Sequence, residues 1–137
     1  MTPLFKKLNL GTHTVVHVLD APASFEPELA QLGATDGISI RRKLSAKDTV
    51  TFALAFATRR VDVDAVSAKL CKAAQGDAVL WMVYPKGSSK KYSCDFNRDT
   101  GWDVLRAAGF DSVRMVAVDE DWSALRLRRV EYIKPSA

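Results

Sequence analysis

The sequence predicts a three-layer α/β domain, with a mostly parallel sheet and an antiparallel C-terminal strand. Two almost wholly apolar segments, 49–58 and 78–85, are typical of central strands that are covered on both faces. Between them, residues 62–75 repeat apolar positions at helical spacing. Strands that alternate with helices in this way form parallel sheets with helices on both faces. We therefore expect one domain over residues 1–137.

Local patterns predict the elements of the first half of the chain. Residues 1–11 are expected to form a partly ordered arm. The β-branched segment 12–22 indicates a buried strand, and residues 24–33 indicate a short helix with Pro27 in its first turn. Residues 37–44 alternate between apolar and polar side chains, which is typical of a strand with one covered face.

The second half continues the alternation of helices and strands. Asp62 is predicted to cap the helix over residues 62–75. A further helix is expected over residues 100–109, followed by a strand over 112–119. The last segment, 124–133, alternates like an edge strand or an antiparallel strand.

Composition narrows the classes of partner. The net charge of +4 and the isoelectric point near 9.2 favour anionic partners. The basic residues are scattered rather than gathered into the dense footprint of a nucleic-acid binder, so nucleic acid is not an expected partner. We see no apolar run long enough to span a membrane and no secretory signal, so we expect a cytoplasmic protein with no membrane partner.

The metal-ligating residue types are too sparse to predict a metal site. Cys71 and Cys94 lie far apart, form no CxxC motif and have no His nearby. Four residues separate His13 and His17 along a strand, which is too far for one shared metal ion. We expect Cys71 to be a packing residue, Cys94 to be more exposed, and both histidines to lie at the surface or an interface.

Five short motifs carry a resemblance to known sequences. They are "LDAP" (19–22), "LWMVYPKGSSK" (80–90), "DFNRD" (95–99), "GW" (101–102) and "VAVDEDWSALRLRR" (116–129). With these motifs, residues 15–128 resemble a bacterial family of uncharacterised Rossmann-like proteins. The resemblance implies a compact α/β fold and brings no established reaction or catalytic residue.

The second half is also similar in layout to methyltransferase-like Rossmann folds. In such folds the turn after the first strand carries glycines that let the backbone approach a cofactor, but the turn "LDAPASF" (19–25) contains none. An acidic residue would ordinarily end the second strand and hold the ribose, yet "RRKLSAKD" (41–48) begins with basic residues. These departures argue against adenosylmethionine or dinucleotide binding, and we predict no cofactor.

The loop within "YPKGSSKKYSCDFNRDTGWDVL" (84–105) is the main candidate site. It should leave the carboxyl end of a central strand, where ligands bind in open α/β sheets. Its lysines supply positive charge, Gly87 allows close backbone approach, and its serines offer hydroxyl groups. The candidate ligand-binding residues are Lys86, Gly87, Ser88, Ser89, Lys90, Lys91, Asn97 and Arg98. The loop lacks the second glycine of a Walker A motif, and a solvated crossover remains the alternative interpretation.

Two further residues are possible cleft residues, Asp20 after the first strand and Trp122 before the last. Core packing is the alternative role for Trp122. Asp95 and Asp99 can order the loop or serve as a general base, and the acidic run 119–121 is typical of a solvated turn. The sequence identifies no catalytic residue.

Three functional hypotheses remain open. The first is a non-catalytic module that binds a small anionic ligand at the carboxyl edge of the sheet. The second is an interaction or assembly protein that forms homo-oligomers through the strand at 124–133, since an unpaired edge is a template for pairing. The third is a divergent methyltransferase-like enzyme. We expect the first.

Overall fold

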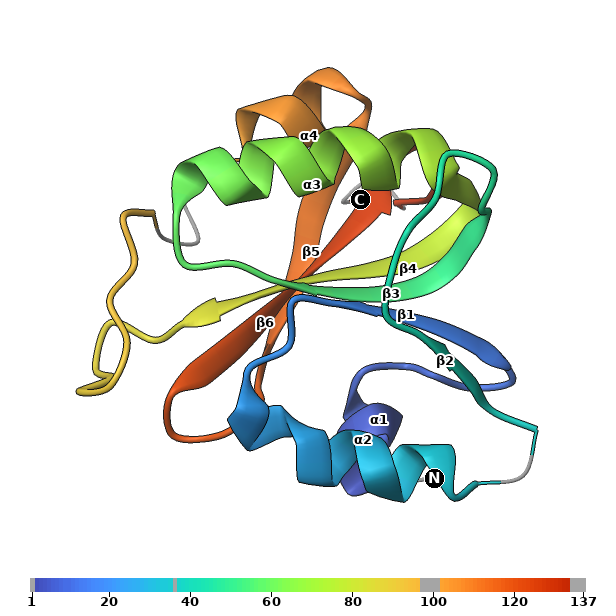
Figure 1. The fold of residues 1–137 in the computed structure, drawn as a ribbon. Coiled ribbons are helices and arrows are strands. Elements are labelled where there is room, and N and C mark those ends of the chain that lie inside the picture. The colour runs from blue at the N-terminus through green and yellow to red at the C-terminus, as the bar shows by residue number, and fades with distance from the viewer. Residues whose placement is uncertain (1, 36, 97–101, 134–137) are drawn as a thin grey trace.

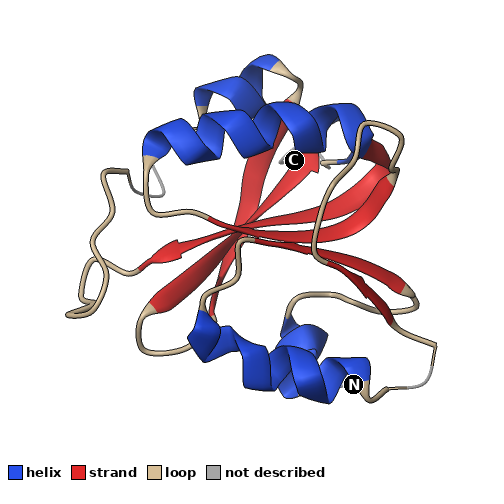
Figure 2. Cartoon of the chain, in the orientation of Figure 1, coloured by secondary structure: helices blue, strands red, loops and turns tan. Residues whose placement is uncertain are grey.

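The computed structural model describes residues 2–35, 37–96 and 102–133. Within them the chain forms one six-stranded sheet with helices on both faces (Figures 1 and 2). The helices are α1 (Pro3–Lys7), α2 (Glu26–Gly33), α3 (Arg60–Ala73) and α4 (Asp103–Ala107), with the short 3-10 helices η1 (Ala23–Phe25) and η2 (Val130–Tyr132). The strands are β1 (Val15–Leu19), β2 (Ser39–Arg41), β3 (Val50–Phe56), β4 (Ala74–Pro85), β5 (Phe110–Ala117) and β6 (Trp122–Arg129).

The sheet has the strand order β2-β1-β3-β4-β6-β5. Strands β2, β1, β3 and β4 pair in parallel, whereas β6 is antiparallel to both of its neighbours, β4 and β5. This arrangement confirms the predicted fold class. The chain passes from β1 to β2 on one side and then returns to place β3 on the other, so the strand order reverses between β1 and β3.

The central strands bury both of their faces, as their continuous apolar sequences predict. On β3, Phe52, Leu54 and Phe56 pack into the core beneath α1 and α2. The intervening Ala53 and Ala55 pack into the other core, beneath α3 and α4. Successive side chains of a strand point to opposite faces, so an apolar residue at every position requires a covering layer on each side.

The N-terminal segment is part of the core, and the prediction of a partly ordered arm over residues 1–11 is wrong. Helix α1 places Phe5 against the sheet, and Leu8 and Leu10 follow it there, all three with no exposed surface. The Leu8 carbonyl also accepts a 2.8 Å hydrogen bond from Nε1 of the buried Trp81 on β4. Phe5 lies on α1, Leu8 is its C-cap residue and Leu10 follows the helix, and all three join the same core cluster.

Strand β6 is an inner strand of the sheet, so the prediction that the strand at 124–133 offers an exposed edge is wrong. Leu125 pairs with Met82 on β4 and with Met115 on β5, so the backbone of β6 is paired on both sides. The final strand returns between the two strands that precede it instead of lying outside them. The edges of the sheet are β2 and β5. Homo-oligomerisation through a sheet edge remains a prediction, and it would use one of those strands.

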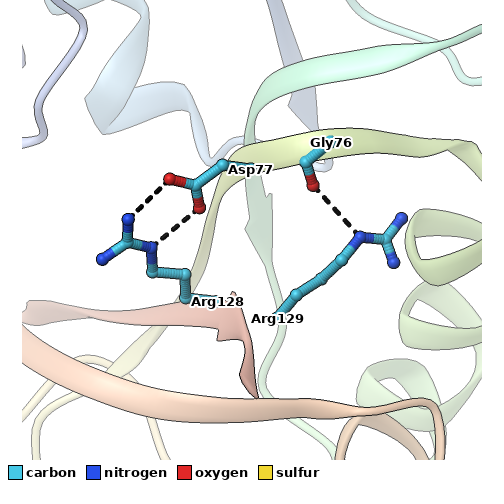
Figure 3. Close-up of polar contacts among 4 residues, drawn as sticks. All are labelled: Gly76, Asp77, Arg128 and Arg129. Carbon is cyan, nitrogen blue, oxygen red and sulfur yellow. Dashed lines mark hydrogen bonds and ion pairs between the residues drawn. The ribbon is translucent and has the colours of Figure 1, made fainter. Parts of the chain in front are cut away.

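The start of β4 is held to the end of β6 by two arginines (Figure 3). The β3–β4 register shifts here, and Gly76 adopts a φ of 58°, a left-handed conformation that glycine takes without a steric penalty. Arg128 grips the Asp77 carboxylate with two hydrogen bonds of 2.7 and 2.6 Å. Arg129 donates to the carbonyls of Gly76 and Ala74. These contacts link the end of β6 to the start of β4 at the place where the β3–β4 register shifts.

Among the residues that the structure describes, no helix is both long enough and apolar enough to cross a membrane.

Truncation of Phe5 tests the role of the N-terminal segment. Because Phe5 is fully buried, Phe5→Ala should lower the free energy of unfolding by about 3–5 kcal/mol. Lys6→Ala, on the exposed side of the same helix, should change it by less than about 0.5 kcal/mol. Urea unfolding measures both, and equal small losses would mean that the segment does not stabilise the fold.

The Arg128–Asp77 pair predicts a dependence of stability on pH. The hydrogen bonds from Arg128 lower the pKa of Asp77 below its ordinary value of 3.8. Stabilisation from a carboxylate with a lowered pKa is present above the ordinary value and is lost as the pH falls through the folded-state pKa. Asp77→Asn should therefore cost about 0.5–1 kcal/mol at pH 7, the range for a partly exposed pair of good geometry. The difference from wild type should shrink towards pH 3, and a difference independent of pH would contradict this account.

Candidate functional site

The parallel strands β1, β3 and β4 end at the same edge of the sheet, at the left of Figure 1. Two adjoining hollows open at this edge, with volumes of about 390 and 320 Å³. The first is lined by Leu19, Asp20, Arg42, Lys43, Leu44, Asp62, Ala65, Val66 and Lys69. The second is lined by Asp20, Phe56, Ala57, Thr58, Asp62 and Trp122. They share Asp20 and Asp62, and we call them together the switch-point crevice because strand order reverses here.

Asp20 lies at the centre of the crevice, in an unusual backbone conformation. Its φ is 59°, in the left-handed region that non-glycine residues seldom adopt and that Asp tolerates better than most. The carboxylate is exposed and has no ion-pair partner among the described residues. The turn after β1 thus takes a conformation typical of glycine at a residue that also presents a negative charge.

Asp62 is the second carboxylate of the crevice. The prediction that it caps α3 is wrong, because the N-cap position is Arg59 and Asp62 lies in the first turn. Its Oδ2 is 3.3 Å from Nε of Arg59, and both side chains are about half exposed or more. The helix therefore begins earlier than the sequence pattern indicates, and this shift brings Asp62 to the edge of the sheet beside Asp20.

The opposite side of the crevice is basic. Arg42 forms an ion pair with Glu26, and the hydrogen bonds from Arg42 lower the pKa of Glu26. Lys43, which follows β2, and Lys69, on α3, line the crevice without an ion-pair partner among the described residues. The crevice thus combines the carboxylates of Asp20, after β1, and Asp62, in the first turn of α3, with the ammonium groups of Lys43, after β2, and Lys69, farther along α3.

Trp122 fulfils both of the roles considered for it. It is 3% exposed and packs edge-on against Phe56, with ring centroids 5.4 Å apart, so it is a core residue. It also lines the crevice. Its indole Nε1 is buried without an acceptor among the residues described, which is uncommon for a buried donor.

The predicted lysine loop surrounds a separate cavity of about 300 Å³, which we call the loop cavity. It is lined by Tyr84, Pro85, Lys86, Gly87, Ser89, Tyr92, Ser93, Cys94 and Phe96. Of the predicted ligand-binding residues, the structure thus gathers Lys86, Gly87 and Ser89 here. Ser88, Lys90 and Lys91 are exposed and do not line it. Asn97 and Arg98 lie outside the described residues.

Several polar groups of this region hold the loops in place. The Ser89 hydroxyl donates to Oδ1 of Asp121 at 2.9 Å and accepts from the backbone N–H of Tyr92 at 3.2 Å. The Asp95 carboxylate accepts a 2.6 Å hydrogen bond from the backbone N–H of Arg60 at the start of α3. Asp95 therefore has the ordering role considered for it, and Asp99 lies outside the described residues.

The histidines and cysteines differ in burial and in pKa. Among the described residues, no group of three or more His, Cys, Asp or Glu side chains is placed to hold an ion. His17 is 3% exposed, so its expected surface position is wrong, and burial lowers its pKa although Asp48 opposes the shift. Burial raises the pKa of Cys71 to about 11 and also raises that of Cys94, so neither thiol is a thiolate at neutral pH.

Sequence reasoning identified Asp20 and Trp122 but missed four other charged residues of the crevice. These are Arg42, Lys43, Asp62 and Lys69. The signal for Asp62 was available, because a polar residue shortly after a central strand lies at the carboxyl edge. Lys69 carried no such signal, since it reaches the crevice only through the packing of α3 over the loop after β2.

The fold is similar to solved methyltransferase structures. A SAM-dependent methyltransferase from Aquifex aeolicus matches with a TM-score of 0.62 and 13% identity, over 93% of this chain and 88% of that chain. The N-methyltransferase NodS from Bradyrhizobium japonicum matches with a TM-score of 0.57 and 12% identity, over 92% of both chains. The pyocyanin biosynthetic protein PhzM matches with a TM-score of 0.52 and 14% identity, and this chain covers 54% of its length. The TM-scores show a methyltransferase-like Rossmann fold. At sequence identities this low, the similarity leaves the activity open.

Sequence comparisons add no assignment to this fold. No family model matches the chain, and no curated protein matches it. The resemblance to an uncharacterised bacterial family therefore remains a hypothesis, whereas the methyltransferase-like layout is a property of the structure.

The backbone of Asp20 makes a testable contribution to stability. Asp20→Ala places a β-carbon in the left-handed region without the side-chain oxygens that favour it, and should cost about 1 kcal/mol. Asp20→Gly should be as stable as wild type or more so, because glycine adopts this φ freely. Thermal unfolding of the two variants checks the order, and an alanine variant as stable as the glycine variant would contradict it.

Proposed function

We propose that this chain is a divergent methyltransferase-like protein that binds S-adenosylmethionine in the switch-point crevice. The observation that carries the proposal is the position of the crevice, at the reversal of strand order in a fold similar to that of SAM-dependent methyltransferases. Ligands of open α/β sheets bind at this place, outside the carboxyl ends of the strands. The fold similarity favours this hypothesis over the non-catalytic anion-binding module that we expected from the sequence.

The charges of the crevice fit such a ligand. S-adenosylmethionine has a sulfonium and an ammonium group, both cationic, and a carboxylate. Asp20 and Asp62 provide negative charge at the ends of β1 and β3, while Lys43 provides positive charge at the end of β2. Trp122 adds an aromatic side chain to the lining of the second hollow. Opposite charges at the two ends of a cleft favour a ligand that itself carries both signs.

Methyl transfer from a sulfonium demands mainly positioning of the acceptor. The acceptor atom forms a bond to the methyl carbon, the carbon–sulfur bond breaks with its electrons remaining on sulfur, and the acceptor loses a proton. Holding the two reactants in line lowers the barrier without a protein nucleophile. The residues of this chain would act by binding and orienting.

The turn after β1 distinguishes this chain from dinucleotide-binding Rossmann proteins. Those proteins use glycines to let the backbone approach the ligand, whereas residues 20–25 contain none. Asp20 supplies the left-handed conformation at one position, and its β-carbon keeps the backbone farther from the ligand than glycine would. We therefore expect weaker binding than a glycine-rich turn provides.

A thermal-shift titration tests the proposal. S-adenosylmethionine at ten times its dissociation constant should add about 1.4 kcal/mol to the free energy of unfolding. For a chain of this size that corresponds to a rise in melting temperature of about 4 °C. Asp20→Asn keeps the shape of the side chain and removes its charge, so it should weaken binding about fivefold or more.

Asp64→Asn is the matched control, because Asp64 lies on the same helix as Asp62 but does not line the crevice. It should bind as wild type does. The proposal fails if neither S-adenosylmethionine nor S-adenosylhomocysteine raises the melting temperature at millimolar concentration. It also fails if Asp20→Asn binds as tightly as wild type.

A further inference from the structure

The loop cavity is separate from the switch-point crevice, although both open at the carboxyl edge. It lies where the chain leaves β4, in the segment that extends away from the sheet at the left of Figure 1. Tyr92 lines the loop cavity and Trp122 lines the crevice, and their rings pack together with centroids 4.8 Å apart. This aromatic pair lies between the two hollows.

Three aromatic side chains, those of Tyr84, Tyr92 and Phe96, line the loop cavity. Tyr84 and Phe96 lie on one side, with ring centroids 5.4 Å apart, and both are more than nine-tenths buried. Trp102 packs edge-on behind Phe96 at 5.4 Å and supports that wall. Tyr92 forms another part of the lining. Packed aromatic walls favour a planar apolar group, and the volume of about 300 Å³ is at the small end of ligand sites.

The charge of the loop cavity is positive only. No Asp or Glu is among its described lining residues, whereas two line the crevice. Lys86 is half-buried in the lining and has no ion-pair partner among the residues described. Its backbone is fixed, because its N–H donates to the Asp121 carbonyl at 2.8 Å and its carbonyl accepts from the N–H of Ser89 at 3.0 Å.

Two of the polar side chains that line the cavity with Lys86 are already engaged in hydrogen bonds. The Ser89 hydroxyl is occupied by Asp121, and the Cys94 thiol donates to the Phe96 carbonyl at 3.2 Å. Burial raises the pKa of Cys94, so the thiol is neutral at pH 7 and adds no negative charge to the cavity.

We infer that the loop cavity binds a small aromatic carboxylate, with its ring against Tyr84, Tyr92 and Phe96 and its carboxylate on Lys86. The ring gains aromatic contacts, and the carboxylate gains a charge-assisted hydrogen bond in a partly desolvated position. The inference gives a chemical class to the anion that the sequence predicted at this loop. It assigns the binding of that anion to Lys86 and not to the exposed Lys90 and Lys91. The inference does not rest on the binding of S-adenosylmethionine.

Isothermal titration calorimetry with benzoate, in the absence of S-adenosylmethionine, tests the inference. Wild type should bind with a dissociation constant of about 1 mM or tighter, which a ligand of this size reaches in a fitted site. Lys86→Met removes the charge but keeps most of the apolar stem, and should weaken binding about tenfold or more. Lys7→Met makes the same change at an exposed position of α1, across the sheet, and should leave the affinity within about twofold.

Two fragments of the probe separate its two recognised features. Benzyl alcohol keeps the ring without the charge, and acetate keeps the charge without the ring, so each should bind about tenfold more weakly than benzoate. The inference is overturned if wild type does not bind benzoate, if Lys86→Met binds it as tightly as wild type, or if acetate binds as tightly as benzoate. Because no S-adenosylmethionine is present, these outcomes are independent of whether the crevice binds it.

Discussion

The requirement to cover both faces of β3 and β4 determines the architecture. These strands present apolar side chains in both directions, so neither face tolerates water and each needs a layer of helices. Helices α3 and α4 supply one layer. The other consists of α2 and of α1, whose short length would not keep it folded alone. The hydrogen bond from Trp81 to the Leu8 carbonyl ties that N-terminal segment to the central strand, and burial of Phe5 makes it part of the fold.

Because helices cover both faces of the sheet, ligand sites are expected at the carboxyl ends of the parallel strands. With both faces covered, hollows that can hold a ligand open where strands end and loops begin. This edge divides into two hollows of different character. The crevice carries Asp20 and Asp62 together with lysines, whereas the loop cavity is aromatic and carries Lys86. Tyr92 lines the loop cavity and Trp122 lines the crevice, and the contact between their rings lies between the two hollows. The two ligands that we propose, a zwitterion and an aromatic anion, would bind at neighbouring positions of this edge.

The sequence predicted what depends on local periodicity and missed what depends on long-range packing. Apolar runs and helical spacing were sufficient for the α/β class and for the central strands. They did not place β6 between β4 and β5, because an alternating pattern suits an edge strand and an inner antiparallel strand equally well. They did not show that His17 is buried, since that follows from its neighbours across the sheet. In the crevice, Asp20 was accessible from its position after a strand, but Lys69 joins it only through tertiary packing.

The turn after β1 shows why likeness of fold does not transfer function by itself. A glycine-rich turn and an acidic residue after the second strand are the features that let such folds hold a nucleoside cofactor. This chain retains the left-handed backbone at that turn, at Asp20, but with a side chain in place of a hydrogen. It also exchanges the acidic residue for Arg42 and Lys43. The crevice therefore has the usual position for a ligand in such folds but a different set of charges. A ligand has to fit both the position and these charges. The ligand that we propose would place its cationic groups towards Asp20 and its anionic group towards Lys43.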